Sequence, residues 1–233
     1  MTEGDAAGIA ASGGLLGDVI LDAISRHADA TAFVDEDGEA SYREFGLMVA
    51  QAMQRLEQLG LPRGATIAQI SENCTWQYAL MAAAYIGGFR SLTLHTMGGQ
   101  EDQLYILKDS GAQILVGGPG RIADAARLAG DVGIACYAHQ SDDVVEPFWP
   151  NAAASSGLPA RAIGNAEDIV RLAYTGGTTG RPKGVMLSNR ALVANTLMAL
   201  ARIEFPAEIR FLCPAPISHG AGSVVLPTLV RGG

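Results

Sequence analysis

The sequence predicts an α/β fold of alternating β-α units with mainly parallel sheets. From residue 15 on, helix-like stretches alternate with short β-rich ones, and this alternation is typical of parallel sheets. A composition of 48% hydrophobic and 17% charged residues suits a packed core and argues against disorder. The length of 233 residues allows one large domain or two small ones.

The first clear helix signal is Ser41-Tyr42-Arg43-Glu44, a capping box. Apolar residues follow at three- and four-residue steps, as on one face of a helix: Tyr42, Phe45, Val49, Met53, Leu56 and Leu59. Gly60 and Pro62 end this helix. A strand is expected at 66–70, followed by a helix at 75–86 whose mostly small residues predict close packing on a sheet.

The alternation continues to the end of the chain. We expect helices at 100–110, at 121–128 and from the N-cap Ser188 to about Arg202. Further strands are expected at 91–94, 113–116, 134–137 and 168–174. A last strand, at 211–213, is expected to run into a proline-containing turn.

Two stretches lack this periodicity. Residues 140–166 are rich in Ser, Asp, Pro, Gly and Ala and predict a linker between an α/β unit at 15–139 and a second segment at 167–233. Residues 1–14 are small and acidic, without the basic and apolar regions of a secretory signal, and predict a disordered tail.

Charge and cysteine usage exclude several classes of function. A net charge of −8 disfavours nucleic-acid and anionic-membrane binding, which need basic patches. No uncharged apolar stretch reaches the roughly eighteen residues of a membrane span. Cys74, Cys136 and Cys213 are far apart and form no Cys-x-x-Cys pair, so disulfides and zinc are not expected and a reducing, cytoplasmic location fits.

The most informative stretch is the glycine-rich run at residues 172–188, LAYTGGTTGRPKGVMLS. Its glycines free the backbone to bring N–H groups close to an anion: Gly176, Gly177, Gly180 and Gly184. Thr175, Thr178 and Thr179 add hydroxyl groups, and Lys183 adds a positive charge. The run predicts a polyphosphate site, although it lacks the Gly-Lys-Ser/Thr ending of a Walker loop. A surface turn between two strands remains the alternative.

Residues 174–190 resemble the signature of the acyl-adenylate-forming superfamily, which includes acyl-CoA synthetases, adenylation domains of peptide synthetases and luciferases. The resemblance implies that the loop wraps the β- and γ-phosphates of ATP while a carboxylate attacks the α-phosphate. The acyl group then passes to a thiol such as that of coenzyme A. Gly176 stands where many members carry Ser, which removes one hydroxyl donor.

The resemblance also assigns roles to residues. Lys183 and Thr178 would be catalytic, with Thr178 touching Mg²⁺. The ATP-binding set would be Thr175, Gly176, Gly177, Thr178, Thr179, Gly180 and Lys183.

Two further stretches are similar to the same superfamily. Tyr105 to Ala112 matches a Tyr-x-Leu-x-Asp-Ser-Gly-Ala pattern, which we interpret as β-α-β packing. Pro216 to His219 matches a Pro-x-x-His element that borders the acyl tunnel and implies that His219 lies near the carboxylate and the adenylate. Ser218 stands where many members carry an aromatic residue, and a surface or capping histidine remains the alternative for His219. His27, His95 and His139 show no partner pattern and are expected to be ordinary surface or core residues.

Together, these features imply an N-terminal part of an ATP-dependent carboxylic acid ligase, most like an acyl-CoA synthetase. Its cofactors would be ATP, Mg²⁺ and coenzyme A, and its substrate a small-molecule carboxylate. Superfamily members continue beyond the equivalent of Gly233, so we expect little catalysis by these 233 residues alone, and self-association through uncovered apolar surface. An adenylation domain serving a carrier protein and a non-catalytic nucleotide- or acyl-binding module are the two alternatives.

Overall fold

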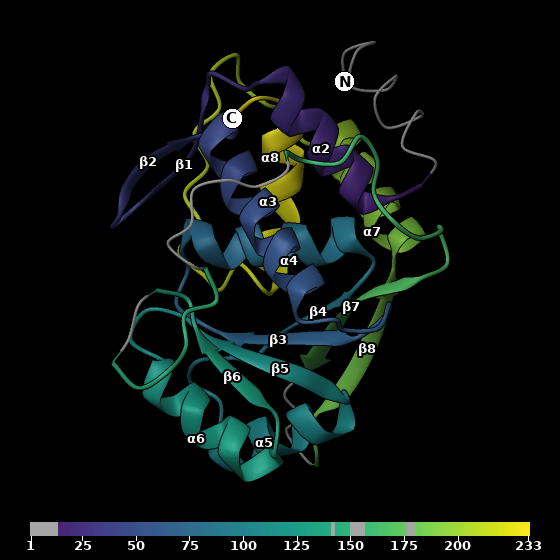
Figure 1. The fold of residues 1–233 in the computed structure, drawn as a ribbon. Coiled ribbons are helices and arrows are strands. Elements are labelled where there is room, and N and C mark those ends of the chain that lie inside the picture. Colours follow the sequence, from purple (N-terminus) through teal and green to yellow (C-terminus); the bar gives the residue numbers. More distant parts are fainter. Residues whose placement is uncertain (1–13, 141–142, 150–156, 176–179) are drawn as a thin grey trace.

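The computed structural model describes residues 14–140, 143–149, 157–175 and 180–233, and it confirms the α/β fold (Figure 1). One six-stranded sheet lies between two helical layers, with α2, α3 and α4 over one face and α5 and α6 over the other. A separate two-stranded hairpin lies beside the first layer. None of the described helices is long and apolar enough to cross a membrane.

The sheet has the strand order β6-β5-β3-β4-β7-β8. Its strands are β3 (Thr66–Ile70), β4 (Arg90–Thr93), β5 (Ala112–Gly117), β6 (Ala135–Ala138), β7 (Ile169–Thr175) and β8 (Lys183–Ser188). Neighbouring strands from β6 to β7 are parallel, and β8 pairs antiparallel with β7. The strands expected before the glycine-rich run are therefore confirmed, whereas β8 was not predicted.

The helices expected after Ser41, at 75–86, at 100–110, at 121–128 and after Ser188 are confirmed, and the helices at 16–26 and 225–230 had no predicted bounds. The helices are α2 (Leu16–Arg26), α3 (Tyr42–Gln58), α4 (Thr75–Gly87), α5 (Gln100–Asp109), α6 (Ile122–Val132), α7 (Asn189–Arg202) and α8 (Val225–Val230), with a 3₁₀ helix η1 (Gly220–Val224) before α8. The capping box is confirmed, because the backbone N–H of Glu44 donates to Ser41 Oγ and that of Ser41 donates to a Glu44 carboxylate oxygen. Ser188 caps α7 by accepting from the backbone of Ala191.

A tertiary contact replaces the local cap of α4. The hairpin of β1 (Thr31–Asp35) and β2 (Gly38–Ser41) was not predicted, and it places Asp35 at the start of α4. There the carboxylate accepts from the backbone N–H and the hydroxyl of Thr75, both at 2.7 Å. Burial raises the pKa of Asp35, but these hydrogen bonds outweigh it and leave the pKa below its usual value.

The expected strand at 211–213 is wrong. Phe211 to Cys213 lie in an irregular segment between α7 and η1. Strand formation needs a neighbouring strand to satisfy the backbone, and here a side chain does part of that work: Asn73 Nδ2 donates to the carbonyl of Cys213 at 3.1 Å. Leu212 is 82% exposed.

The core has one part on each face of the sheet. The larger cluster includes buried residues of α2, α3, α4 and α8, and the smaller one lies against α5 and α6. Ala82, Ala83 and Ala84 of α4 are almost fully buried, which confirms the close packing expected of that helix. Phe148 and Trp149, within the expected linker, also belong to the larger cluster. The segments at 15–139 and 167–233 contribute strands to one sheet, and their division into domains stays a prediction.

Candidate active site

The topology marks one edge of the sheet as the place for a site. The chain passes from β3 through α4 to β4, and then through α5 to β5 on the other side of β3. The connections that leave β3 and β5 therefore run in opposite directions, so the strand order reverses between β3 and β5, and ligands of open parallel sheets bind outside the carboxyl ends of strands near such a switch point.

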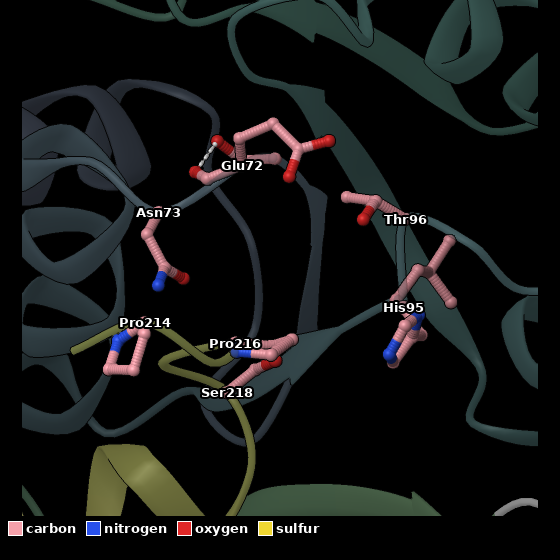
Figure 2. A pocket seen from close by; sticks show the side chains of 9 residues that line it. Glu72, Asn73, His95, Thr96, Pro214, Pro216 and Ser218 are labelled. Carbon is pink, nitrogen blue, oxygen red and sulfur yellow. Dashed lines mark hydrogen bonds between the residues drawn. The ribbon is translucent and has the colours of Figure 1, made fainter. Parts of the chain in front are cut away.

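A cavity of about 270 Å³ lies beside this switch point, outside the carboxyl ends of β3 and β4 (Figure 2). Three segments form it: the turn after β3, the turn after β4, and the irregular segment before η1. Its lining residues are Ser71, Glu72, Asn73, Leu94, His95, Thr96, Pro214, Pro216 and Ser218. In the view of Figure 2, Asn73 and Pro214 lie on one side of the opening and His95 and Thr96 on the other.

Asn73 fixes the irregular segment against the turn after β3. Its Nδ2 donates to the carbonyls of Cys213 and Ala215, at 3.1 and 2.8 Å, and its Oδ1 accepts from the backbone N–H of Ile217 at 2.9 Å. One side chain thus provides hydrogen-bond partners for three backbone groups of a segment that forms no strand. His219 follows Ile217, the last residue that Asn73 binds, by two positions.

His219 lies at the start of η1, with its ring against a second histidine. Its Nδ1 is 2.9 Å from Ser218 Oγ, and its ring meets that of His95 edge-on with the centroids 5.3 Å apart. Arg171 of β7 donates to the carbonyl of Ser218. Partial burial, His95 and Arg171 lower the pKa of His219, which favours the neutral ring. Because His219 is largely accessible to solvent, water partly screens the effects of His95 and Arg171 on it.

The glycine-rich run connects β7 to β8, and its described residues form the base of a hairpin. Thr175, the last residue of β7, pairs with Lys183, the first of β8. Because β7 is parallel to β4, both residues lie at the carboxyl edge of the sheet that also carries the cavity. Gly180 and Lys183 are exposed. Gly176, Gly177, Thr178 and Thr179 lie outside the described residues, so their roles stay predictions.

The expected site residues therefore fall into two groups. Thr175 and Lys183 face each other across the hairpin, while His219 belongs with His95 and Ser218 beside the cavity. His95 had been expected to be an ordinary residue, and the structure places it in the cavity wall. Asn73 was also missed. The available signal was their position, since each follows a parallel strand at its carboxyl end.

Metal-binding side chains are not concentrated among the described residues of this site. Among the described residues, no three His, Cys, Asp or Glu side chains come together in a way that could hold one. Mg²⁺ usually keeps several waters and binds through one or two carboxylates together with substrate phosphates. The described residues therefore fit a magnesium ion that arrives with ATP better than one held in a protein cage.

Comparison with known proteins gives consistent relatives. A medium/long-chain fatty-acid–CoA ligase, FadD8, of Mycobacterium tuberculosis is 27% identical over 93% of this chain and 40% of its own length. A feruloyl-CoA synthase of Amycolatopsis is 31% identical over 90% of this chain and 40% of its own length. A nonribosomal peptide synthetase of Neosartorya fischeri, ftmPS, is 25% identical over 84% of this chain and 9% of its own length.

Solved structures agree. The amide bond synthetase McbA of Marinactinospora thermotolerans matches with a TM-score of 0.81 at 25% identity, over 92% of this chain and 43% of its own. ATP-bound MatB of Rhodopseudomonas palustris matches with a TM-score of 0.79 at 26% identity, over 93% and 44%.

The chain thus spans about 40% of the length of the fatty-acid–CoA ligase and of the feruloyl-CoA synthase. The family model described as AMP-binding enzyme matches residues 21–233. With the fold, the cavity at the carboxyl edge of the sheet and the glycine-rich run in agreement, the chain belongs to the AMP-binding enzyme family of adenylate-forming enzymes.

Proposed function

We propose that the protein activates a carboxylic acid with ATP and then transfers the acyl group to coenzyme A. One observation carries the proposal: in a chain of the AMP-binding enzyme family, Thr175 and Lys183 lie at the sheet edge that also holds the cavity and His219. The site thereby combines a cation and a glycine-rich run for phosphates with a cavity of about 270 Å³ for part of a small molecule.

The first step needs charge neutralisation more than covalent chemistry. A carboxylate oxygen would attack the α-phosphorus, the bond from that phosphorus to the bridging oxygen would break, and pyrophosphate would leave. Lys183, with the backbone and hydroxyl groups from Thr175 to Gly180, would hold the β- and γ-phosphates as this charge develops. Magnesium, touched by Thr178, would neutralise further charge. His219, kept neutral, would lie near the carboxylate and the adenylate.

In the second step a thiol sulfur would attack the acyl carbon, and AMP would leave with the electron pair of the acyl–oxygen bond. Coenzyme A is favoured as the acceptor because two relatives, aligned over 90% or more of the chain, are named as a fatty-acid–CoA ligase and a feruloyl-CoA synthase. Peptide synthetases and an amide bond synthetase are also similar, so a carrier-protein thiol and an amine are the competing acceptors. The three cysteines are free thiols, which fits a cytoplasmic enzyme.

The full-length protein should be incubated with MgATP and panels of fatty and hydroxycinnamic acids, and acyl-AMP, AMP and acyl-CoA measured by mass spectrometry. The proposal expects acyl-AMP with at least one acid and its conversion to acyl-CoA when coenzyme A is added. Acyl-AMP that reacts only with an amine or a carrier protein would retain the first step and overturn the second. Nucleotide binding without acyl-AMP from any acid would support a non-catalytic module.

A further inference from the structure

Helix α5 ends in a charge that local rules disfavour. Asp109 is its last residue, and a carboxylate at a helix C-terminus opposes the helix dipole and the unpaired carbonyl groups there. Natural sequences break such a rule mostly where another interaction compensates. The stretch Tyr105 to Ala112, interpreted from sequence as β-α-β packing, contains this residue.

Two tyrosine hydroxyls compensate Asp109. Tyr174 of β7 donates to its Oδ2 at 2.6 Å, and Tyr105 of α5 donates to its Oδ1 at 3.3 Å. The shorter distance lies in the range of a charge-assisted bond between a hydroxyl and a carboxylate. Burial and the Asp109 charge raise the pKa of Tyr174, so the hydroxyl remains a donor at all ordinary pH values. Asp109 thereby ties α5 to the residue before Thr175.

Arg181, in the second half of the glycine-rich run, also contacts this group through Tyr105. The guanidinium of Arg181 lies 5.4 Å from the centroid of the Tyr105 ring, within the range of a cation–π contact. Gly184 pairs with Tyr174 across the hairpin, and a Cβ there would come within 2.9 Å of the tyrosine ring. The glycine therefore leaves room for the ring against β8, with its hydroxyl bonded to Asp109.

We propose that Asp109 is a positioning residue for the glycine-rich run. It holds described residues from both halves of the run, Tyr174 and Arg181, against the end of α5. Tyr174 connects it to the first half of the run, and Tyr105 connects it to Arg181 in the second half. A site held in place before ATP arrives loses less conformational freedom on binding. This inference rests on the proposed function, because it assigns the run to ATP.

The test compares Asp109→Ala with Asp102→Ala in the full-length protein. Both residues are exposed aspartates of α5, but Asp102 lies in the first turn, where a carboxylate suits the helix dipole. We expect D109A to raise the KM for ATP about tenfold, the effect of losing about 1.4 kcal/mol, with the KM for the acid unchanged. Y174F should do the same, and the D109A/Y174F double variant should be no worse than either single variant.

A second readout needs no activity. Lys108 and Lys183 are the lysines of this sequence, so a lysine-specific protease reports directly on the start of β8. Cleavage after Lys183 should be faster in D109A and Y174F than in D102A, while the melting temperature of D109A stays level or rises.

Equal ATP kinetics and equal cleavage rates in D109A and D102A would overturn the proposal. The proposal would also be overturned if D109A lowered the melting temperature and impaired every kinetic constant alike, because Asp109 would then only stabilise the fold. If the unsubstituted protein activates no acid, the proposed function fails instead, and the cleavage rates alone decide the role of Asp109.

Discussion

Asn73 Oδ1 accepts a hydrogen bond from the backbone N–H of Ile217 at 2.9 Å, across 144 residues of sequence. The same amide donates to two carbonyls on the other side of Pro216. Three hydrogen bonds from one side chain thereby hold this irregular segment against the turn after β3, and His219, two residues after Ile217, lies beside the cavity.

Replacing Asn73 tests this anchor. Asn73→Ala loses three hydrogen bonds at an exposed site, so we expect a loss of about 1–2 kcal/mol in unfolding free energy, measured by urea denaturation, and a lower kcat. Asn73→Asp should be no better than Ala, because its carboxylate can accept from Ile217 but repels the carbonyls of Cys213 and Ala215. An aspartate variant indistinguishable from the unsubstituted protein would show that the donor side of the amide is unimportant.

Removing the charge of Lys183 tests the phosphate site. Lys183→Met should lower kcat/KM for ATP on the order of 100-fold, the usual effect of removing one group that stabilises developing charge. The side chain is exposed at the start of β8, so the melting temperature should change little. Lys183→Arg keeps the charge and should lose less. Unchanged steady-state kinetics in the methionine variant would remove Lys183 from the proposed machinery.

His139 gives the fold a pH dependence. The side chain is 5% exposed, and neither ring nitrogen has a hydrogen-bond partner among the described residues. Burial lowers its pKa from the ordinary 6.5, although Asp37 opposes the shift. The unfolded chain therefore binds the proton more readily, and unfolding free energy should fall as the pH drops below about 6.5. Urea titrations of His139→Gln should show a shallower fall between pH 6.5 and 5, and an equal slope would contradict this account.

Phe148 tests whether the stretch after β6 is part of the core. Its side chain is 0% exposed and lies against Tyr137 and Trp149. Phe148→Ala should reduce the unfolding free energy by about 3–5 kcal/mol, the usual loss for a buried aromatic residue. Val144→Ala, at a side chain that is 90% exposed, should change it by less than about 0.5 kcal/mol. Equal small effects would mean that residues 143–149 only connect elements.

The fold was predictable where a local signal and a tertiary contact agree. The capping box at Ser41 and the apolar period after it predicted α3, and the small residues of α4 predicted its burial. Prediction failed where a distant side chain decides the backbone. The apolar residues Phe211 and Leu212 suggested a strand, but the amide of Asn73 binds the carbonyl of Cys213 and holds the segment as an irregular one, and nothing local to residues 211–213 encodes that contact.

The candidate site was predictable to the same extent. The glycine-rich run carries its chemistry in consecutive residues, so its location could be found from sequence. His95 follows β4, and His219 belongs to the segment that Asn73 holds at the end of β3. The two rings meet because these parallel strands end at the same edge of the sheet. The hydrogen bond between Asp109 and Tyr174 joins residues 65 positions apart, and the packing of α5 on the face of the sheet brings them together, not spacing along the chain.

The most direct measurement is the exchange of labelled pyrophosphate into ATP by the full-length protein, with and without a carboxylic acid, before and after the Lys183→Met change. The account predicts exchange that depends on the acid and falls on the order of 100-fold in the variant. Exchange without any acid, or acid-dependent exchange that survives the loss of Lys183, would contradict the claim that this site activates carboxylates.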